Sequence, residues 1–203
     1  MKLYYMPGAC SLGVHIVLEW IGAPYEVQRL SHDELKQAPF LAVNPAGAVP
    51  ALAVDGWVLT QNAAILNYLA DSFPEAKLGG DGSPKSRAEI NRWLGVINAD
   101  AHPAFRPLFG ATSYLNDKAA IEATKANAKT RVRQYLQTIN NQLEGRDWLA
   151  SQRSIADPYL FVITRWCEAM EIDLAGLDHV HRFRERMNAD PAVQNVLSAE
   201  GLS

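Results

Sequence analysis

The sequence predicts an α/β half followed by an all-α half, and three observations carry this prediction. Up to residue 78, short β-type runs alternate with helical stretches, whereas after residue 84 every long segment has helical spacing. Between them lies a glycine-rich stretch, Gly79-Gly80-Asp81-Gly82-Ser83-Pro84, which is typical of a linker. The chain has 203 residues, 48% of them hydrophobic, so we expect one domain over residues 1–78 and a second over residues 84–203.

The first domain begins with a strand, a helix and a second strand. Residues 2–6 form a short apolar run closed by Pro7-Gly8. Apolar residues then recur at helical spacing over residues 12–21, and Gly22 ends the helix. Residues 25–30 alternate as a strand does.

The strongest local signal comes next, because Asp55-Gly56 separates two apolar runs at residues 51–54 and 57–59 and so predicts a β-hairpin. Residues 60–73 follow with helical spacing and stop before Pro74. A βαβ unit followed by an antiparallel hairpin predicts a mixed four-stranded sheet with helices against it.

The second domain is predicted to contain only helices. The first begins at Pro84 and is interrupted at Pro103 and Pro107. Ser154 and Asp157 form a carboxylate version of the capping box, and the apolar run that follows predicts the buried central helix of this domain. The remaining helices are expected at residues 117–143, 177–188 and 191–199.

Charge and cysteine content exclude several classes of protein. Lys and Arg total 19 against 22 Asp and Glu, a net charge of −3, which argues against a nucleic-acid partner. No apolar run of about 18 residues predicts a membrane span, so we expect a cytoplasmic protein without a membrane partner. Cys10 and Cys167 are far apart in sequence and belong to no ligand cluster, so we expect neither a disulfide nor a metal site.

Cys10 is the first candidate catalytic residue. It follows a strand and a tight turn and stands at the start of a helix, where free amides and the helix dipole stabilise an anion. We therefore expect a depressed thiol pKa, although a small residue that fills a gap explains the position equally well. Ser11 is either a helix N-cap or a residue whose hydroxyl donates to a bound thiolate. Tyr5 either places its phenol over the same turn or packs inward as a core aromatic.

Two further segments offer backbone groups to a ligand. Val49-Pro50 precedes a strand and is a candidate cis peptide bond, which would leave the Val49 backbone N–H and C=O free. Gln61-Asn62 begins a helix whose free amides can hold a carboxylate, although capping alone also explains polar residues there.

Four blocks of sequence, in order, resemble the cytosolic glutathione S-transferases: MKLYYMPGACSLGVHIVLEWIGAPYEV, FLAVNPAGAVPAL, LTQNAAILNYLAD and SIADPYLF. The opening Tyr-x-Pro-Gly-x-Cys-Ser is similar to that of their bacterial beta class, and the resemblance extends to the C-terminal AEGL. It implies a thioredoxin-like first domain that binds glutathione and a helical second domain that supplies much of the pocket for an electrophile. It also implies a homodimer, with glutathione as co-substrate and no cofactor.

The resemblance assigns roles to individual residues. Cys10 matches the active-site cysteine beside the glutathione sulfur, and Val49 with cis-Pro50 matches the backbone clamp on the cysteinyl part. His102 matches a histidine that reaches the thiol region, although a lone histidine on a helix is more often structural. Gln61 and Asn62 match the residues that hold the γ-glutamyl group, and Asp100, from either subunit, matches an acidic position that can help to hold it. Phe105 and Trp166 are assigned to the electrophile pocket.

The match departs from the family at Arg153, where an apolar residue is usual before Ser154, at Pro158 after the capping box, and at two places that concern glutathione. Gln61 stands where the family usually has an acidic residue, so a charge-assisted hydrogen bond to the γ-glutamyl ammonium is lost. The segment at residues 31–37 is short, which leaves open whether Lys36 or His32 pairs with the glycyl carboxylate.

The sequence thus predicts a glutathione transferase that conjugates glutathione to small hydrophobic electrophiles. Two alternatives stay open. One is a glutathione-dependent thiol transferase or reductase with Cys10 as nucleophile. The other is a non-catalytic binding protein of the same fold, which stays open because Gln61 is neutral where the family usually has an acidic residue.

Overall fold

A computed structural model describes all 203 residues, and its first part is built on a mixed four-stranded sheet in the order β2-β1-β3-β4. The strands are β1 (Lys2–Tyr5), β2 (Glu26–Arg29), β3 (Ala51–Val54) and β4 (Trp57–Thr60). β1 pairs in parallel with β2 and antiparallel with β3, and β3 pairs antiparallel with β4. The predicted fold class, with its mixed sheet, is confirmed.

Local chemistry explains how these strands are connected. Asp55 (φ 47°) and Gly56 (φ 82°) both have positive φ, as a two-residue hairpin turn between β3 and β4 requires. α1 (Ser11–Ile21) crosses from β1 to β2 and ends at Gly22, which has a left-handed conformation. The remaining helices of this part are η1 (Glu34–Lys36), α2 (Ala38–Leu41), α3 (Asn62–Ser72) and η2 (Pro74–Ala76).

The second part contains only helices, as predicted. They are α4 (Pro84–Gly95), η3 (Val96–Ala101), α5 (His102–Ala104), α6 (Lys118–Gln142), α7 (Ala156–Ala169), α8 (Asp178–Ala189) and α9 (Pro191–Glu200). Pro103 does not interrupt the first of them, contrary to our expectation. The π-helical turn η3 joins α4 to α5, and the helical run ends after Ala104.

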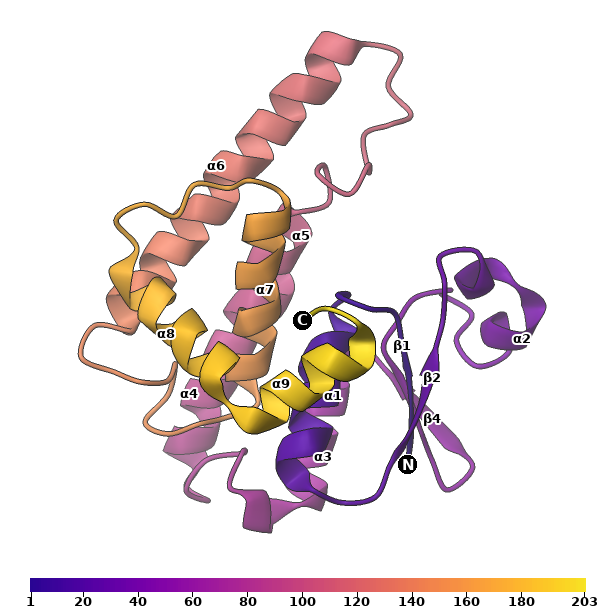
Figure 1. The fold of residues 1–203 in the computed structure, drawn as a ribbon, viewed down its shortest axis with the longest axis vertical. Helices are drawn as coiled ribbons and strands as arrows, with labels where there is room; N and C mark the ends of the chain where they lie inside the picture. The colour runs from indigo at the N-terminus through magenta and orange to yellow at the C-terminus, as the bar shows by residue number, and fades with distance from the viewer.

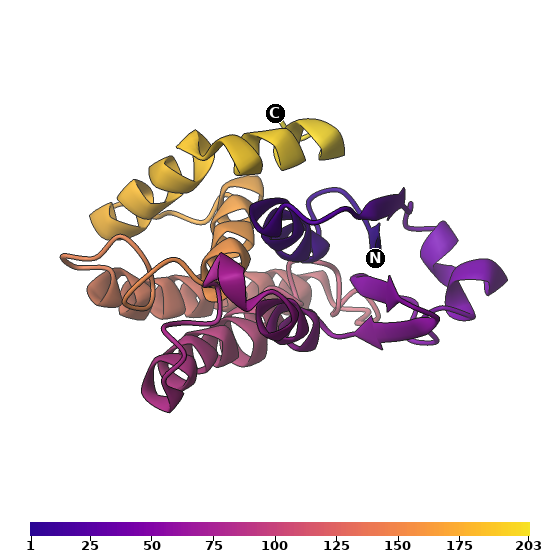
Figure 2. The same ribbon diagram turned by 90° about the horizontal axis from the view of Figure 1, so that it is seen from below.

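The two parts pack around α1, which contacts α3, α7 and α9 (Figures 1 and 2). The N-terminal part of α6 and the loop before it extend away from the remaining helices as an arm, while the rest of α6 packs against α8 and η3 (Figure 1). No helix is both long enough and apolar enough to cross a membrane.

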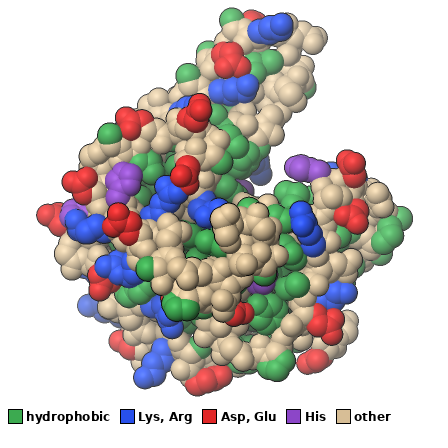
Figure 3. All heavy atoms as spheres, viewed as in Figure 1, with side chains coloured by type: hydrophobic (Ala, Val, Ile, Leu, Met, Phe, Trp, Pro, Cys, Tyr) green, Lys and Arg blue, Asp and Glu red, His purple; other side chains and the backbone are tan.

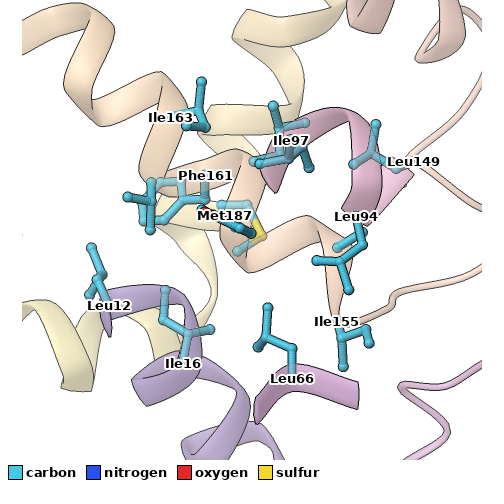
Figure 4. Close-up of a cluster of buried hydrophobic side chains, with 14 of the residues drawn as sticks. Leu12, Ile16, Leu66, Leu94, Ile97, Leu149, Ile155, Phe161, Ile163 and Met187 are labelled. Atoms are coloured by element: carbon cyan, nitrogen blue, oxygen red, sulfur yellow. The ribbon is translucent and has the colours of Figure 1, made fainter. Parts of the chain in front are cut away.

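One hydrophobic core runs through both parts of the chain. Leu12 and Ile16 of α1 and Leu66 of α3 are fully buried beside Ile155 and Phe161 of the second part (Figure 4). α7 is buried along nearly its whole length, in line with the predicted central helix. The boundary between residues 78 and 84 stays a prediction, and the shared core indicates that the two parts depend on each other for stability.

Candidate active site

A cavity of about 340 Å³ lies where the two parts of the chain meet. Thirteen residues line it: Cys10, Asn44, Ala46, Ala48, Val49, Pro50, Gln61 and Asn62 from the first part, and Asn98, His102, Pro103, Arg106 and Tyr159 from the second. The surface is hollowed between the arm and the lobe that carries the sheet and α2 (Figure 3). A larger cavity of about 620 Å³ lies beside the linker, but its Arg87 already pairs with Asp71 at 2.8 Å.

Cys10 lies at the end of the turn between β1 and α1, and its thiol is held as a donor. The Sγ donates to the carbonyl oxygen of Val49 at 3.5 Å. Burial raises the pKa of the Cys10 thiol to about 11, although the backbone N–H groups of Cys10 and Ser11 lower it. The prediction of a depressed pKa is therefore wrong, because desolvation outweighs the helix start. Cys10 is therefore a neutral thiol at pH 7.

Ser11 and Tyr5 are not brought to the cavity. The Ser11 hydroxyl, fully buried, accepts from the Met6 N–H and donates to the Met6 carbonyl, both at 3.3 Å, and so closes the turn below Cys10. Tyr5 packs inward with its ring 5.4 Å from that of His15. Neither interpretation offered for Ser11 describes this arrangement, because Ser11 is the first residue of α1 and its hydroxyl bonds only to Met6, whereas for Tyr5 the structure selects the inward-facing aromatic.

The first part of the chain presents backbone and amide groups to the cavity. The Val49-Pro50 bond is cis, as expected, and both residues line the cavity. Gln61 has φ 74° and ψ 117°, a conformation that non-glycine residues rarely adopt outside functional sites. Asn62 follows as the first residue of α3, and its side chain is 4% exposed with no hydrogen-bond partner for either Nδ2 or Oδ1. A buried amide without partners in a cavity wall is ready to bind a polar ligand.

The second part contributes a hydrogen-bonded chain that begins at His102. Tyr159 Oη donates to Asn98 Oδ1 at 3.3 Å and lies 2.6 Å from His102 Nδ1. A phenol carries one proton, so when Tyr159 donates it to Asn98, His102 donates from Nδ1 to Tyr159 and its Nε2 is an acceptor. Burial and the charge of Arg106 lower the pKa of His102 to about 4, so the imidazole is neutral at pH 7. The sequence-based placement of His102 in the pocket agrees with this geometry.

His102→Gln is expected to change how stability depends on pH. Unfolded histidine titrates near pH 6.5 and His102 of the folded chain near 4, so the unfolded chain binds an extra proton between these values. The neutral imidazole therefore contributes stability that is complete above pH 6.5 and is lost as pH falls toward 4. Urea unfolding should show the free-energy difference between wild type and His102→Gln shrinking from pH 7 to pH 4.5. A difference that stays constant over this range would contradict the lowered pKa.

Phe105 and Trp166 do not line the cavity, contrary to the expectation that they form its electrophile side. Both pack behind His102, with the Trp166 ring 4.7 Å from the imidazole and 5.3 Å from the Phe105 ring. Asp100 is exposed and does not line the cavity of its own chain either. Asp100 and Phe105 lie within and just after the π-helical turn η3, and sequence spacing does not give the direction in which side chains point there. Trp166 lies on α7, where its direction depends on packing between the two parts of the chain.

The turn before Cys10 is held by residues from the far end of the chain. The Gly8 N–H donates to Glu200 Oε2 at 3.0 Å, and its carbonyl accepts from Trp166 Nε1 at 2.8 Å. The other oxygen of Glu200 lies 2.8 Å from Nδ1 of buried His15. Trp166 and Glu200 thus fix both polar groups of Gly8, two residues before the candidate thiol.

Sequence reasoning missed four residues of this region: Asn98, Arg106, Tyr159 and Glu200. Tyr159 was assigned only to the apolar run of a buried helix, and Glu200 belonged to the AEGL block without a role. Lys36 is one of the two basic candidates for pairing with the glycyl carboxylate. Its Nζ donates to the Gly47 carbonyl at 3.1 Å, and the sequence neighbours of Gly47, Ala46 and Ala48, both line the cavity. No group of three or more His, Cys, Asp or Glu side chains could hold a metal ion.

Comparison with known proteins shows the family to which this chain belongs. The family model described as "Glutathione S-transferase, N-terminal domain" matches residues 8–72, and "Glutathione S-transferase, C-terminal domain" matches residues 102–191. The chain is 51% identical to glutathione S-transferase GST-4.5 of Xanthomonas campestris pv. campestris, over the whole of both chains. A solved glutathione S-transferase from Xylella fastidiosa is 51% identical, with a TM-score of 0.97 over 100% of this chain and 99% of that one.

These matches show the class of protein: the chain belongs to the glutathione S-transferase family. Within it, the chain is 35% identical to a bacterial beta-class glutathione S-transferase from Sphingomonas chungbukensis, with a TM-score of 0.89 over all of both chains. The predicted family and the enzyme class of glutathione transferase are confirmed.

Proposed function

We propose that this enzyme joins glutathione to small hydrophobic electrophiles in the cavity between its two parts. The observation that carries the proposal is the lining of that cavity, in which the Cys10 thiol, the Val49 backbone and the unpartnered amide of Asn62 lie together. These groups match the thiol, the peptide and the charged γ-glutamyl end of glutathione in kind. Membership of the glutathione S-transferase family supports the same assignment.

Glutathione is placed with its cysteinyl peptide against Val49 and its γ-glutamyl end at Gln61 and Asn62. Lys36, which already reaches the rim of the cavity through Gly47, is the cation we assign to the glycyl carboxylate. Gln61 offers a neutral amide to the γ-glutamyl ammonium, so the hydrogen bonds at this end rely on Asn62 and on the amides at the start of α3.

The reaction is a nucleophilic substitution or addition by the glutathione sulfur. The new C–S bond forms at the electrophilic carbon, the leaving group departs with its bonding electrons, and the thiol proton passes to solvent. Because its own thiol is neutral at pH 7, Cys10 gives up its hydrogen bond to the Val49 carbonyl, donates to the glutathione thiolate instead, and does not act as the nucleophile. His102 Nε2 accepts from the glutathione thiol before the proton leaves. The raised pKa of Cys10 thus favours conjugation over the thiol-transferase alternative.

Cys10→Ala is expected to lower kcat/KM for glutathione and 1-chloro-2,4-dinitrobenzene by about tenfold, because it removes a hydrogen bond to a charged sulfur. Cys167→Ala is the matched control, since Cys167 is buried in α7 and does not line the cavity. Initial rates of the three proteins measure the effect.

Equal rates for wild type and Cys10→Ala would contradict the role given to Cys10. Faster turnover of a glutathione mixed disulfide than of the aryl halide would favour the thiol transferase. Glutathione binding with no turnover of either substrate would favour the binding protein.

We also propose a cytoplasmic homodimer. Trp57 and Val58 of the edge strand β4 are 50% and 36% exposed, and the Trp57 ring packs 5.5 Å from that of Tyr68 on α3. An apolar patch on an unpaired sheet edge is typical of a surface that a partner covers. In such a dimer Asp100, exposed on its own chain, is available to the second site. Sedimentation velocity, with Trp57→Glu as the variant, tests this assembly.

A further inference from the structure

The wall that the second part of the chain gives to the cavity is polar and carries one cation, Arg106. None of the thirteen lining residues is Asp or Glu. No carboxylate lies within 4.0 Å of the Arg106 guanidinium, whereas Arg87, Arg153 and three further arginines of the chain form ion pairs. Other arginines of the chain also lack a counter-ion, but Arg106 is the one that lines this cavity, where it is exposed and has no acid beside it.

The charge of Arg106 acts inside the cavity. It helps to lower the pKa of the neighbouring His102. With His102 and Cys10 both neutral at pH 7, the guanidinium is the only formal charge among the lining side chains. An anionic group that enters the cavity therefore meets attraction and no opposing carboxylate.

The two ends of glutathione are assigned to the first part of the chain, at Lys36 and at Gln61 with Asn62. Arg106 belongs to the second part of the chain, four residues after His102 and just beyond the end of α5. An anion held by Arg106 would therefore be bound from the wall opposite the groups assigned to glutathione.

We propose that Arg106 binds a carboxylate of the electrophile, so that this enzyme prefers electrophiles with a carboxylate on an otherwise apolar skeleton. This inference rests on the proposed function, which supplies glutathione as the nucleophile. The planar guanidinium suits a carboxylate because it can donate two parallel hydrogen bonds. The rings of His102 and Tyr159 and the side chain of Pro103 line the same wall and provide contacts for the apolar part of the substrate.

Two aryl chlorides form the test: 4-chloro-3,5-dinitrobenzoate, which carries a carboxylate, and neutral 1-chloro-2,4-dinitrobenzene, from which it also differs in the position of one nitro group. In each, the glutathione sulfur bonds to the carbon that holds chlorine, chloride leaves with the bonding pair, and the thiol proton goes to solvent. The readout is the ratio of kcat/KM for the benzoate to kcat/KM for the neutral compound, each corrected for its uncatalysed rate with glutathione. Arg131→Ala, at an exposed arginine on α6 outside the cavity, is the matched control for loss of one positive charge.

Arg106→Ala is expected to lower this ratio by about fivefold, Arg106→Lys by less, and Arg131→Ala not at all. The wild-type ratio should also fall as salt is raised, because screening weakens an exposed ion pair. An unchanged ratio in Arg106→Ala would overturn the proposal. So would a fivefold rise in KM for glutathione with both compounds, because Arg106 would then bind a glutathione carboxylate. If wild type neither binds glutathione nor conjugates either compound, the proposed function fails as well, and calorimetry with glutathione distinguishes that case.

Discussion

Asp157→Ala is expected to lower the free energy of unfolding by about 4 kcal/mol, because it leaves several buried donors without an acceptor. The Asp157 carboxylate, fully buried at the start of α7, accepts from the Leu149 N–H at 3.0 Å, the Ser154 N–H at 2.8 Å and the Ser154 hydroxyl at 2.9 Å. Burial raises its pKa to about 6 while these bonds lower it, so the group is ionised at pH 7. Urea unfolding at pH 7 measures the loss.

A second helix-capping aspartate provides the control for Asp157→Ala. Asp117 caps α6 and accepts from the N–H groups of Ala119 and Ala120, but it is exposed. Asp117→Ala should therefore cost only about 1 kcal/mol, since water replaces the lost bonds. Equal losses in the two variants would show that burial of the Asp157 bonds adds nothing to the cap.

Glu200→Ala is expected to lower the free energy of unfolding by about 3 kcal/mol and also to slow conjugation. The carboxylate side chain is fully buried and binds the Gly8 N–H and His15 Nδ1, both of which would lose their partner. Gly8 lies two residues before Cys10, so the position of the thiol would become less well defined. Urea unfolding and kcat with 1-chloro-2,4-dinitrobenzene measure the two effects.

Two variants separate the roles of Glu200. Glu200→Gln keeps an acceptor for Gly8 and should retain more stability and more activity than Glu200→Ala. Glu185→Ala removes an exposed glutamate from α8 and should change neither quantity. A Glu200→Ala protein that is destabilised yet has an unchanged kcat would restrict Glu200 to a structural role.

Features that depend on neighbours in sequence could be predicted from the sequence. Asp55-Gly56 specifies a hairpin turn because both residues tolerate positive φ, and the pairing of β3 with β4 follows from it. The Ser154 and Asp157 cap is likewise local: Ser154 Oγ accepts from the Ala156 N–H at 3.3 Å while the carboxylate reaches back.

Features that depend on contacts between the two parts could not be predicted in the same way. The pKa of Cys10 is set by how completely the cavity walls exclude water, and this opposes what the helix start alone indicates. Glu200 accepts from the Gly8 N–H although the two residues are 192 positions apart in sequence, and no local sequence pattern predicts such a contact. Trp166 was expected to line the electrophile pocket, but it does not line the cavity and its indole instead donates to the Gly8 carbonyl.

Calorimetric titration of glutathione into wild type and Asn62→Leu asks most directly whether this cavity is the glutathione site. Asn67→Leu is the matched control, because Asn67 lies on the same helix, also has an Oδ1 without a partner, and does not line the cavity. We predict that wild type and Asn67→Leu bind glutathione with similar affinity and that Asn62→Leu binds about tenfold more weakly, through loss of hydrogen bonds to a charged group. Equal affinity in all three proteins, or no binding to wild type at millimolar glutathione, would contradict the assignment of this cavity to glutathione.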